Sequence, residues 1–230
     1  MRLEEQLWEE ARRVDFSALP FLRSVADGSC PIEVLRAYAL DLATLAEGFT
    51  GHLATIFAHC DDVPVRHAVL ANLLEEEGVQ SFDGHELVTP AGRGHGALAC
   101  ELARVFGADP AAPRRPLRST WLDQKLRAGD WLSALAFMTV GYEANVPTVF
   151  KPLVEGLRTH YGYSDADLEY LVMHVTADEE HGAEGVAMVG RLGVTPETRQ
   201  LVLDGARRGT LAWYQVHRRH GQAIERRSVA

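Results

Sequence analysis

The sequence lacks long apolar runs and paired cysteines. No stretch approaches the roughly 18 apolar residues of a membrane-spanning helix. The N-terminus, Met-Arg-Leu-Glu-Glu, lacks the apolar core of a signal peptide. Only three cysteines occur among 230 residues, and no two of them form a CxxC pair. An odd count without a disulfide framework is typical of a reducing compartment, so we expect a cytoplasmic protein.

Positive charge is also scarce. The chain has 23 basic and 32 acidic side chains, which give a formal net charge of -9. Because it has no basic stripe, we expect neither nucleic acid nor an anionic membrane as a partner. Hydrophobic residues make up 47% of the chain, enough to bury a sizeable core. These features favour a soluble globular protein whose partner is a small-molecule substrate.

Strand-like alternation is rare, and helical periodicity extends through nearly the whole chain. No repeat, low-complexity segment or long linker divides it, so we predict an all-α, single-domain protein. A long helix is expected from Pro31 to about His59, and a last helix from Pro196 to about His220. We expect the domain to cover residues 1–222 and residues 223–230 to form a frayed polar tail.

The helix predicted from about residue 165 to 192 has polar residues in the middle of an apolar face. Steps of three and four residues along that face place a carboxylate between two imidazoles. Burying such groups costs several kcal/mol (~2–7 for a polar group) unless they are paired or bind a cation. A bound metal ion would offset that cost, so the pattern indicates a metal site. The alternative is that these residues form an ion pair on a solvated face. The face consists of Leu171, His174, Asp178, His181, Gly185, Met188 and Leu192.

Glu143 is the one charged residue on another apolar helix face, which contains Val140, Val146 and Phe150. This pattern predicts an inward-facing carboxylate that binds the same metal site, and a pairing with Arg or Tyr is the alternative. Pro147 cannot donate a hydrogen bond to the carbonyl of Glu143, so we expect a kink there.

The first half of the chain offers less distinct candidates. In the run Glu75-Glu76-Glu77, the apolar periodicity predicts that only Glu76 faces inward. The alternative is that all three acids are solvated, which is common at the end of a helix. His95 begins a helix face with Leu98, Leu102 and Phe106, whereas only a short apolar stretch follows His85. His95 is therefore favoured, and His85 remains an alternative.

Glu47 is a lesser candidate because the periodicity places it on the inner face with Leu40 and Ala43. It would be an extra carboxylate at the metal or a contact to the substrate.

Several motifs in their order and spacing resemble the haem-oxygenase-like diiron oxidases, and most of all the branch that contains the para-aminobenzoate synthases. The resemblance covers roughly residues 20 to 190. It rests on Arg36-Ala-Tyr-Ala39, Cys60-Asp-Asp62, Asn72-Leu-Leu-Glu-Glu76, Tyr142-Glu143 with Pro147, Gly156-Leu157, Tyr161-Gly-Tyr-Ser164 and His174-x3-Asp178-x2-His181.

The resemblance implies a seven-helix bundle that holds two iron ions with three histidines and three carboxylates. An iron–manganese pair is the alternative. Tyr142, Glu179 and Glu180 are near enough in sequence to orient the imidazoles. Carried over to this chain, the implied ligands are Glu76, His95, Glu143, His174, Asp178 and His181.

The resemblance also implies an O2-dependent oxidase of a small carboxylic acid or amino acid, by C–H abstraction, oxidative decarboxylation or fragmentation, or N-oxygenation. An external electron donor and a homodimer are further expectations. The aminobenzoate branch consumes its own tyrosine, but this chain has Leu22, Leu42 and Ala43 where that branch has tyrosines near the metals. Lys151 lies near a lysine of that branch, out of register.

Two other functions fit the same helical pattern. The first is a metal-free enzyme such as thiaminase II or the cofactor-independent oxidase of pyrroloquinoline quinone synthesis. Thiaminase II needs a cysteine in the fifth helix, and this chain has none between residues 130 and 160. A true haem oxygenase is also disfavoured, because it needs a proximal histidine on an early helix and the first 51 residues contain no histidine. The second is a helical protein-interaction module with a relic metal site.

Overall fold

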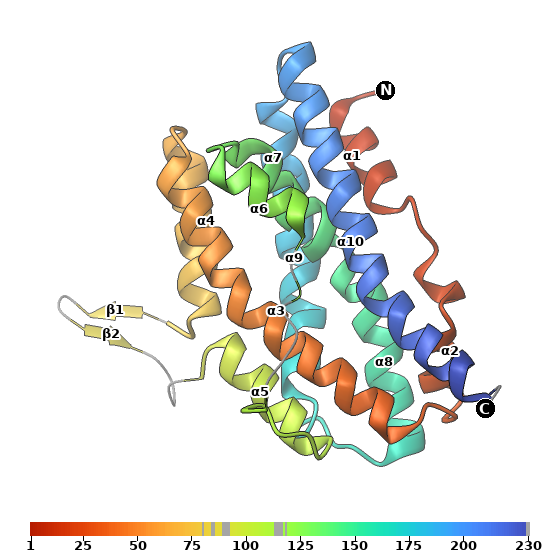
Figure 1. Cartoon of the computed structure of the whole chain (residues 1–230). Coiled ribbons are helices and arrows are strands. Elements are labelled where there is room, and N and C mark those ends of the chain that lie inside the picture. Colours follow the sequence, from red (N-terminus) through yellow and green to blue (C-terminus); the bar gives the residue numbers. More distant parts are fainter. Residues whose placement is uncertain (80, 84–85, 89–92, 113–116, 118, 229–230) are drawn as a thin grey trace. The chain divides into compact units, whose positions relative to one another are not determined.

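The computed structural model describes residues 1–79, 81–83, 86–88, 93–112, 117 and 119–228. Helices make up most of these residues (Figure 1), so the all-α prediction is confirmed. The helices outnumber the seven that were predicted, because some predicted helices are divided. They are α1 (Leu3–Ala11), α2 (Pro20–Ala26), α3 (Ile32–His59), α4 (Val63–Glu76), α5 (His95–Val105), α6 (Thr120–Arg127), α7 (Trp131–Ala136), α8 (Val146–Tyr161), α9 (Glu169–Leu192) and α10 (Pro196–Ser228).

A short hairpin between α4 and α5 was not predicted. Strand β1 (Ser81–Asp83) pairs antiparallel with β2 (Glu86–Val88), and Ser81 lies opposite Val88. Strands of three residues are too short for an alternating pattern to stand out in a sequence.

The chain forms two compact units. The first contains residues Met1–Leu35 and Leu132–Ala230, and the second contains Arg36–Trp131. In the first unit, α10 packs against α1 and α2, and α8 packs against α9. Its core includes Phe21, Phe137 and Phe150, which are almost completely buried. The second unit has its own apolar residues on α3 and α5, such as Leu53 and Leu102.

The chain between α7 and α8 departs from α-helical geometry. Phe137–Tyr142 forms a π-helical turn and Glu143–Asn145 a 3-10 turn. The regular α-helix is therefore interrupted directly before Pro147, which stands in the first turn of α8. The missing N–H of Pro147 leaves the carbonyl of Glu143 without its α-helical donor. Such π turns occur frequently at functional sites.

The ends of the helices agree with the capping residues. The side chain of Asp62 accepts a hydrogen bond from the backbone N–H of Val65 at 3.0 Å, which caps α4. The last helix, by contrast, was predicted to end near His220 but continues to Ser228. Residues 223–228 are thus helical rather than frayed, and residues 229 and 230 lie outside the described part of the chain.

Tertiary packing explains the longer helix. Gly221 is buried, and a Cβ there would lie 3.3 Å from the backbone nitrogen of Phe21. Near the end of the helix, Arg227 Nη1 donates to Glu33 Oε2 at 3.2 Å. These contacts offset the roughly 1 kcal/mol by which glycine weakens a helix.

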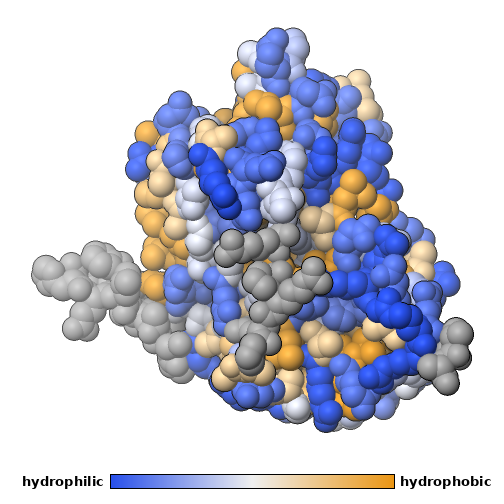
Figure 2. All heavy atoms as spheres, viewed as in Figure 1, coloured by the Kyte–Doolittle hydropathy of each residue, from blue (hydrophilic) through white to orange (hydrophobic). Residues whose placement is uncertain are grey.

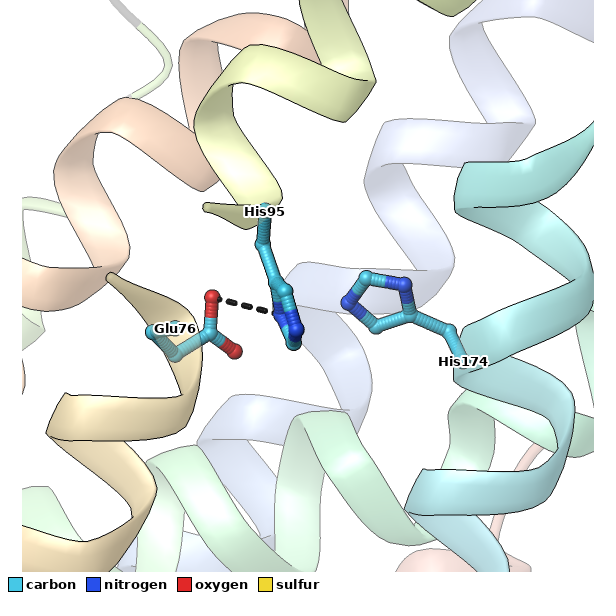
Figure 3. Close-up of side chains that lie close together, drawn as sticks. All are labelled: Glu76, His95 and His174. Atoms are coloured by element: carbon cyan, nitrogen blue, oxygen red, sulfur yellow. Dashed lines mark ion pairs between the residues drawn. The ribbon is translucent and has the colours of Figure 1, made fainter. Parts of the chain in front are cut away.

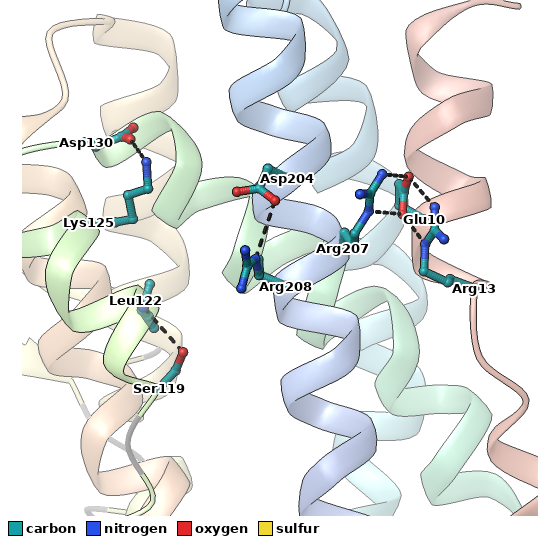
Figure 4. A network of polar contacts seen from close by, with 9 residues as sticks. All are labelled: Glu10, Arg13, Ser119, Leu122, Lys125, Asp130, Asp204, Arg207 and Arg208. Atoms are coloured by element: carbon teal, nitrogen blue, oxygen red, sulfur yellow. Dashed lines mark hydrogen bonds and ion pairs between the residues drawn. The ribbon is translucent and has the colours of Figure 1, made fainter.

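A buried carboxylate ties the first helix to the last (Figure 4). Glu10 on α1 accepts hydrogen bonds from Arg13 Nη2 at 2.7 Å and from Arg207 Nη2 of α10 at 3.0 Å. Burial raises the pKa of Glu10, but the two guanidinium groups outweigh it and the net pKa is lowered. Among the described residues, no helix has both the length and the apolar character needed to cross a bilayer.

Candidate metal centre

Three predicted ligands lie together in the first unit. Glu143 and Asp178 are buried, with 4% and 5% of their surface exposed, and His181 is half-buried. One potential ligand atom from each residue lies within 4.8 Å of those of the other two. His181 Nδ1 is 3.7 Å from Asp178 Oδ1. The predicted inward orientation of Glu143 and Asp178 is therefore confirmed.

A bound cation would stabilise this arrangement of two carboxylates and an imidazole. Two carboxylates buried so close together repel each other, and neither keeps the hydration that would offset the repulsion. The Oδ2 atom of Asp178 is buried and has no hydrogen-bond partner among the described residues. Such an orphaned acceptor costs about 1–3 kcal/mol. Oxygen and imidazole donors suit iron, manganese or zinc, so the residues fit a metal ion.

Close helix packing positions these three ligands. A Cβ at Gly182 would lie 2.6 Å from Ala144 Cα, next to Glu143. A Cβ at Gly185 would lie 2.6 Å from Thr139 Cβ. Because glycine has no side chain at these points, α9 approaches the irregular segment that carries Glu143 more closely than any other residue would allow.

His174 lies one helical turn before Asp178 on the same face of α9 and is buried. Its Nδ1 atom is 2.7 Å from the carbonyl oxygen of Tyr170. A carbonyl oxygen only accepts hydrogen bonds, so Nδ1 carries the proton and donates it. Nε2 is therefore the nitrogen that carries the lone pair, which is the usual arrangement of a metal-binding histidine.

The second unit contains the other pair of predicted ligands. His95 Nδ1 lies 2.9 Å from Glu76 Oε2 (Figure 3), and the side chains are 5% and 10% exposed. Two ligands about 2.1 Å from one metal, at a right angle, are about 3 Å apart. The pair thus forms an ion pair whose spacing also suits two ligands on one ion.

A close backbone approach holds this pair together. Gly78, with a φ of 74°, follows the end of α4, and Gly94 precedes His95. A Cβ at Gly94 would lie 2.7 Å from the carbonyl oxygen of Glu76. The chain therefore returns to the end of α4 just before His95. Glu75 and Glu77 are exposed, as predicted from the periodicity.

The two lesser candidate ligands, His85 and Glu47, are not supported by the described residues. His85 lies outside the described residues. Glu47 is exposed, so the prediction that it faces inward is wrong. The buried face of α3 contains Leu42, Ala46 and Leu53. Glu47 directly follows Ala46, so its side chain is rotated by about 100° from that face.

The structure also shows contacts that were not anticipated. Glu179 and Glu180, predicted to orient imidazoles, are exposed, and Glu179 pairs with Lys151. The carbonyl of Tyr170 orients His174 instead. The sequence carries no signal for this bond, since every helical histidine has a carbonyl four residues earlier and only the rotamer decides whether they meet.

Residues 36–214 match the sequence profile of a family described as iron-containing redox enzymes. The chain is 27% identical over 201 residues to a 4-aminobenzoate synthase of Chlamydia muridarum, which covers 85% of this chain and 80% of that protein. It is 28% identical over 211 residues to a 4-aminobenzoate synthase of Nitrosomonas europaea, with 82% and 78% covered.

Solved structures share the fold. A TenA homologue from Pseudomonas syringae superposes with a TM-score of 0.72 at 12% identity, over 96% of this chain and 91% of that chain. A CADD-like protein of unknown function from Nostoc punctiforme gives 0.69 at 17% identity, over 96% of both chains. The haem-oxygenase-like architecture predicted from the sequence is thereby confirmed, and the chain belongs to the family of iron-containing redox enzymes.

Proposed function

We propose that this protein is an O2-dependent non-haem diiron oxidase of a small carboxylic acid or amino acid. The observation that carries the proposal is the buried cluster of Glu143, Asp178 and His181, whose ligand atoms lie within 4.8 Å of one another. Membership in an iron-containing redox family supports iron as the metal. The proposed ligands of the two ions are Glu76, His95, Glu143, His174, Asp178 and His181.

Two bound ferrous ions would supply electrons for the reduction of O2 and the oxidising power to attack a substrate. The residues of the chain hold and orient the ions. The carbonyl of Tyr170 keeps the Nδ1 proton on His174, so that Nε2 stays basic. The carboxylates of Glu143 and Asp178 balance the positive charge in a site with little access to water.

We propose an external substrate rather than a side chain of the protein. The relatives named above are 4-aminobenzoate synthases, and the branch they represent is implied to consume its own tyrosine. Leu22, Leu42 and Ala43 stand at the corresponding positions, and all three are buried and aliphatic. Lys151 is half exposed and paired with Glu179. None of these side chains is a phenol that could be consumed.

The proposal includes partners. A small-molecule substrate and an external electron donor are required for turnover. A homodimer is also proposed, and the surface of α4 supports it. Val63 and Leu70 are 55% and 37% exposed, and apolar atoms gather at the edge formed by α4 in Figure 2. Light scattering at several protein concentrations tests this part, and a single monomer mass throughout would contradict it.

The central test is metal binding followed by reaction with O2. Protein prepared without metal is titrated with Fe(II) under anaerobic conditions, and we expect two ions per chain. Exposure to O2 should then produce a transient change in the visible absorbance. Oxygen consumption is next measured with panels of fatty acids and amino acids. Protein that takes up no iron, or that shows no O2-dependent absorbance when loaded, would exclude the proposal and favour a metal-free enzyme or an interaction module.

A further inference from the structure

A group of aromatic rings surrounds the ligand helix α9 in the first unit. The ring centroids of His174 and Tyr170 are 4.3 Å apart, and Phe150 lies 6.1 Å from His174. Phe150 in turn lies 6.1 Å from Trp213 on α10. A ligand of the proposed metal centre is thus connected to a buried indole through a single intervening ring.

A second connection reaches the same indole. Tyr142 directly precedes the proposed ligand Glu143, and its ring lies 5.2 Å from that of Trp213 in an edge-to-face arrangement. The contacts from His174 and from Glu143 therefore converge on Trp213. The other three tryptophans of the chain, Trp8, Trp121 and Trp131, are only half-buried.

The environment of Trp213 is unusual for a structural residue. Its exposed fraction is 4%, and its Nε1–H has no hydrogen-bond partner among the described residues. A buried tryptophan usually finds a partner for this group. A buried donor without a partner destabilises the folded protein, and phenylalanine or leucine at this position would not have that cost.

Contacts continue from Trp213 toward the surface. The ring of His217 lies 4.4 Å away, Phe16 is 6.1 Å from His217, and Tyr214 is 5.8 Å from Phe16. Tyr214 is half-buried. Burial lowers the pKa of His217 to about 3, so this ring is neutral at physiological pH and does not oppose a positive charge on the neighbouring indole.

We propose that Trp213 is a one-electron relay that reduces the oxidised iron centre when no substrate is bound. Trp213 loses one electron, which passes toward His174 and Glu143 and reduces the centre by one equivalent. The indole keeps its Nε1 proton because no described residue accepts it, and becomes a cation radical. A soluble one-electron reductant of the ascorbate class then returns an electron by way of Tyr214. The inference rests on the proposed function.

Aromatic neighbours support a transient positive charge at this position. The rings of Tyr142 and Phe150 lie 5.2 and 6.1 Å from that of Trp213. An aromatic face that turns toward a cation stabilises it, and the effect is stronger away from water. This electron transfer would protect the protein, because the oxidised centre is reduced before it can oxidise the residues that bind it.

The experiment uses the iron-loaded full chain, mixed with O2 in the absence of substrate and frozen at short times for electron paramagnetic resonance. We expect a radical signal that changes when the protein is grown with ring-deuterated tryptophan. Trp213→Phe should abolish that signal, and the control Trp121→Phe should retain it. Trp213→Tyr restores a redox-active side chain and should give a signal sensitive to deuterated tyrosine instead.

A second readout is damage. Peptide mass spectrometry after repeated exposure to O2 should show several-fold more oxidation of His174 and Tyr170 in Trp213→Phe than in the wild type. Ascorbate should protect the wild type and not the variant. Iron uptake without any tryptophan-derived signal in the wild type would overturn the relay alone, even if the variants fail to fold. Absence of iron uptake would overturn the proposed function and the relay together.

Discussion

The two proposed ligand sets differ in how their charges are balanced without a metal. Glu76 and His95 form an ion pair, in which Glu76 Oε2 lies 2.9 Å from His95 Nδ1. Glu143 and Asp178 are two buried carboxylates, and Asp178 Oδ2 has no hydrogen-bond partner among the described residues. We therefore expect the set in the first unit to gain more stability from a bound cation than the set in the second unit, where an acid already faces a base.

The sets also differ in how they are positioned. A short return of the chain, with Gly78 and Gly94 in close approach, places Glu76 beside His95. Packing between segments far apart in the chain, with Gly182 and Gly185 at the contacts, places Asp178 and His181 beside Glu143. Local geometry therefore governs one set, and helix packing governs the other.

The largest expected effect follows from removing a ligand of each set. In Asp178→Ala, we expect iron affinity and oxidase activity to fall by about 100-fold or more, since even indirect partners of metal ligands contribute 10–100-fold. Iron content by elemental analysis and Fe(II) titration measure this. Glu76→Ala should weaken iron binding as well.

The contrast between the two variants lies in stability without metal. Asp178→Asn removes one of two repelling charges and should raise the melting temperature of the iron-free protein. Glu76→Gln removes half of an ion pair and should lower it. Calorimetry with and without a chelator measures both, and equal shifts of the same sign would contradict the comparison.

The next effect concerns the close helix contact. Gly185→Ala places a methyl group 2.6 Å from Thr139 Cβ, and such overpacking typically destabilises by about 1–3 kcal/mol. Urea unfolding measures the loss, and iron affinity should fall with it. The matched control is Gly96→Ala on α5, where nothing lies within 4 Å and alanine should stabilise the helix by up to about 1 kcal/mol. Similar destabilisation by both variants would show that helix packing does not distinguish the two sets.

Acid should affect the unit that contains His217. Its folded pKa of about 3 lies below the unfolded value of 6.5, so the unfolded state binds more protons between these limits. This contribution to stability is complete above pH 6.5 and is lost as the pH falls toward 3, by up to about 1.4 kcal/mol per pH unit. Urea unfolding at pH 7 and at pH 5.5 should show a smaller drop for His217→Leu than for the wild type. An unchanged pH dependence would contradict the assignment.

The smallest effect is expected at Lys151. Because its ion pair with Glu179 is about half exposed, Lys151→Met should change the free energy of unfolding by at most about 1 kcal/mol. Iron stoichiometry should be unchanged. The intact mass of the wild type should also stay constant after turnover, and a mass loss that Lys151→Met prevents would instead indicate that this lysine is consumed.

Much of the site follows from the sequence, because a helix repeats every 3.6 residues and a charge on an apolar face stands out. This periodicity was sufficient to predict the burial of His174, Asp178 and Glu143, and Pro147 indicated a departure from regular helix near Glu143. Both signals are local, so neighbouring residues alone determine them.

Tertiary structure decided the rest. The periodicity predicted that Glu47 faces inward, but in the folded chain no described segment covers it and it is exposed. Only the close approach of Gly78 and Gly94 brings Glu76 to His95, and only the rotamer of His174 directs its Nδ1 to the carbonyl of Tyr170. The physical reason is that a sequence defines the faces of each helix, whereas contacts with distant segments determine which faces are covered and which rotamers remain.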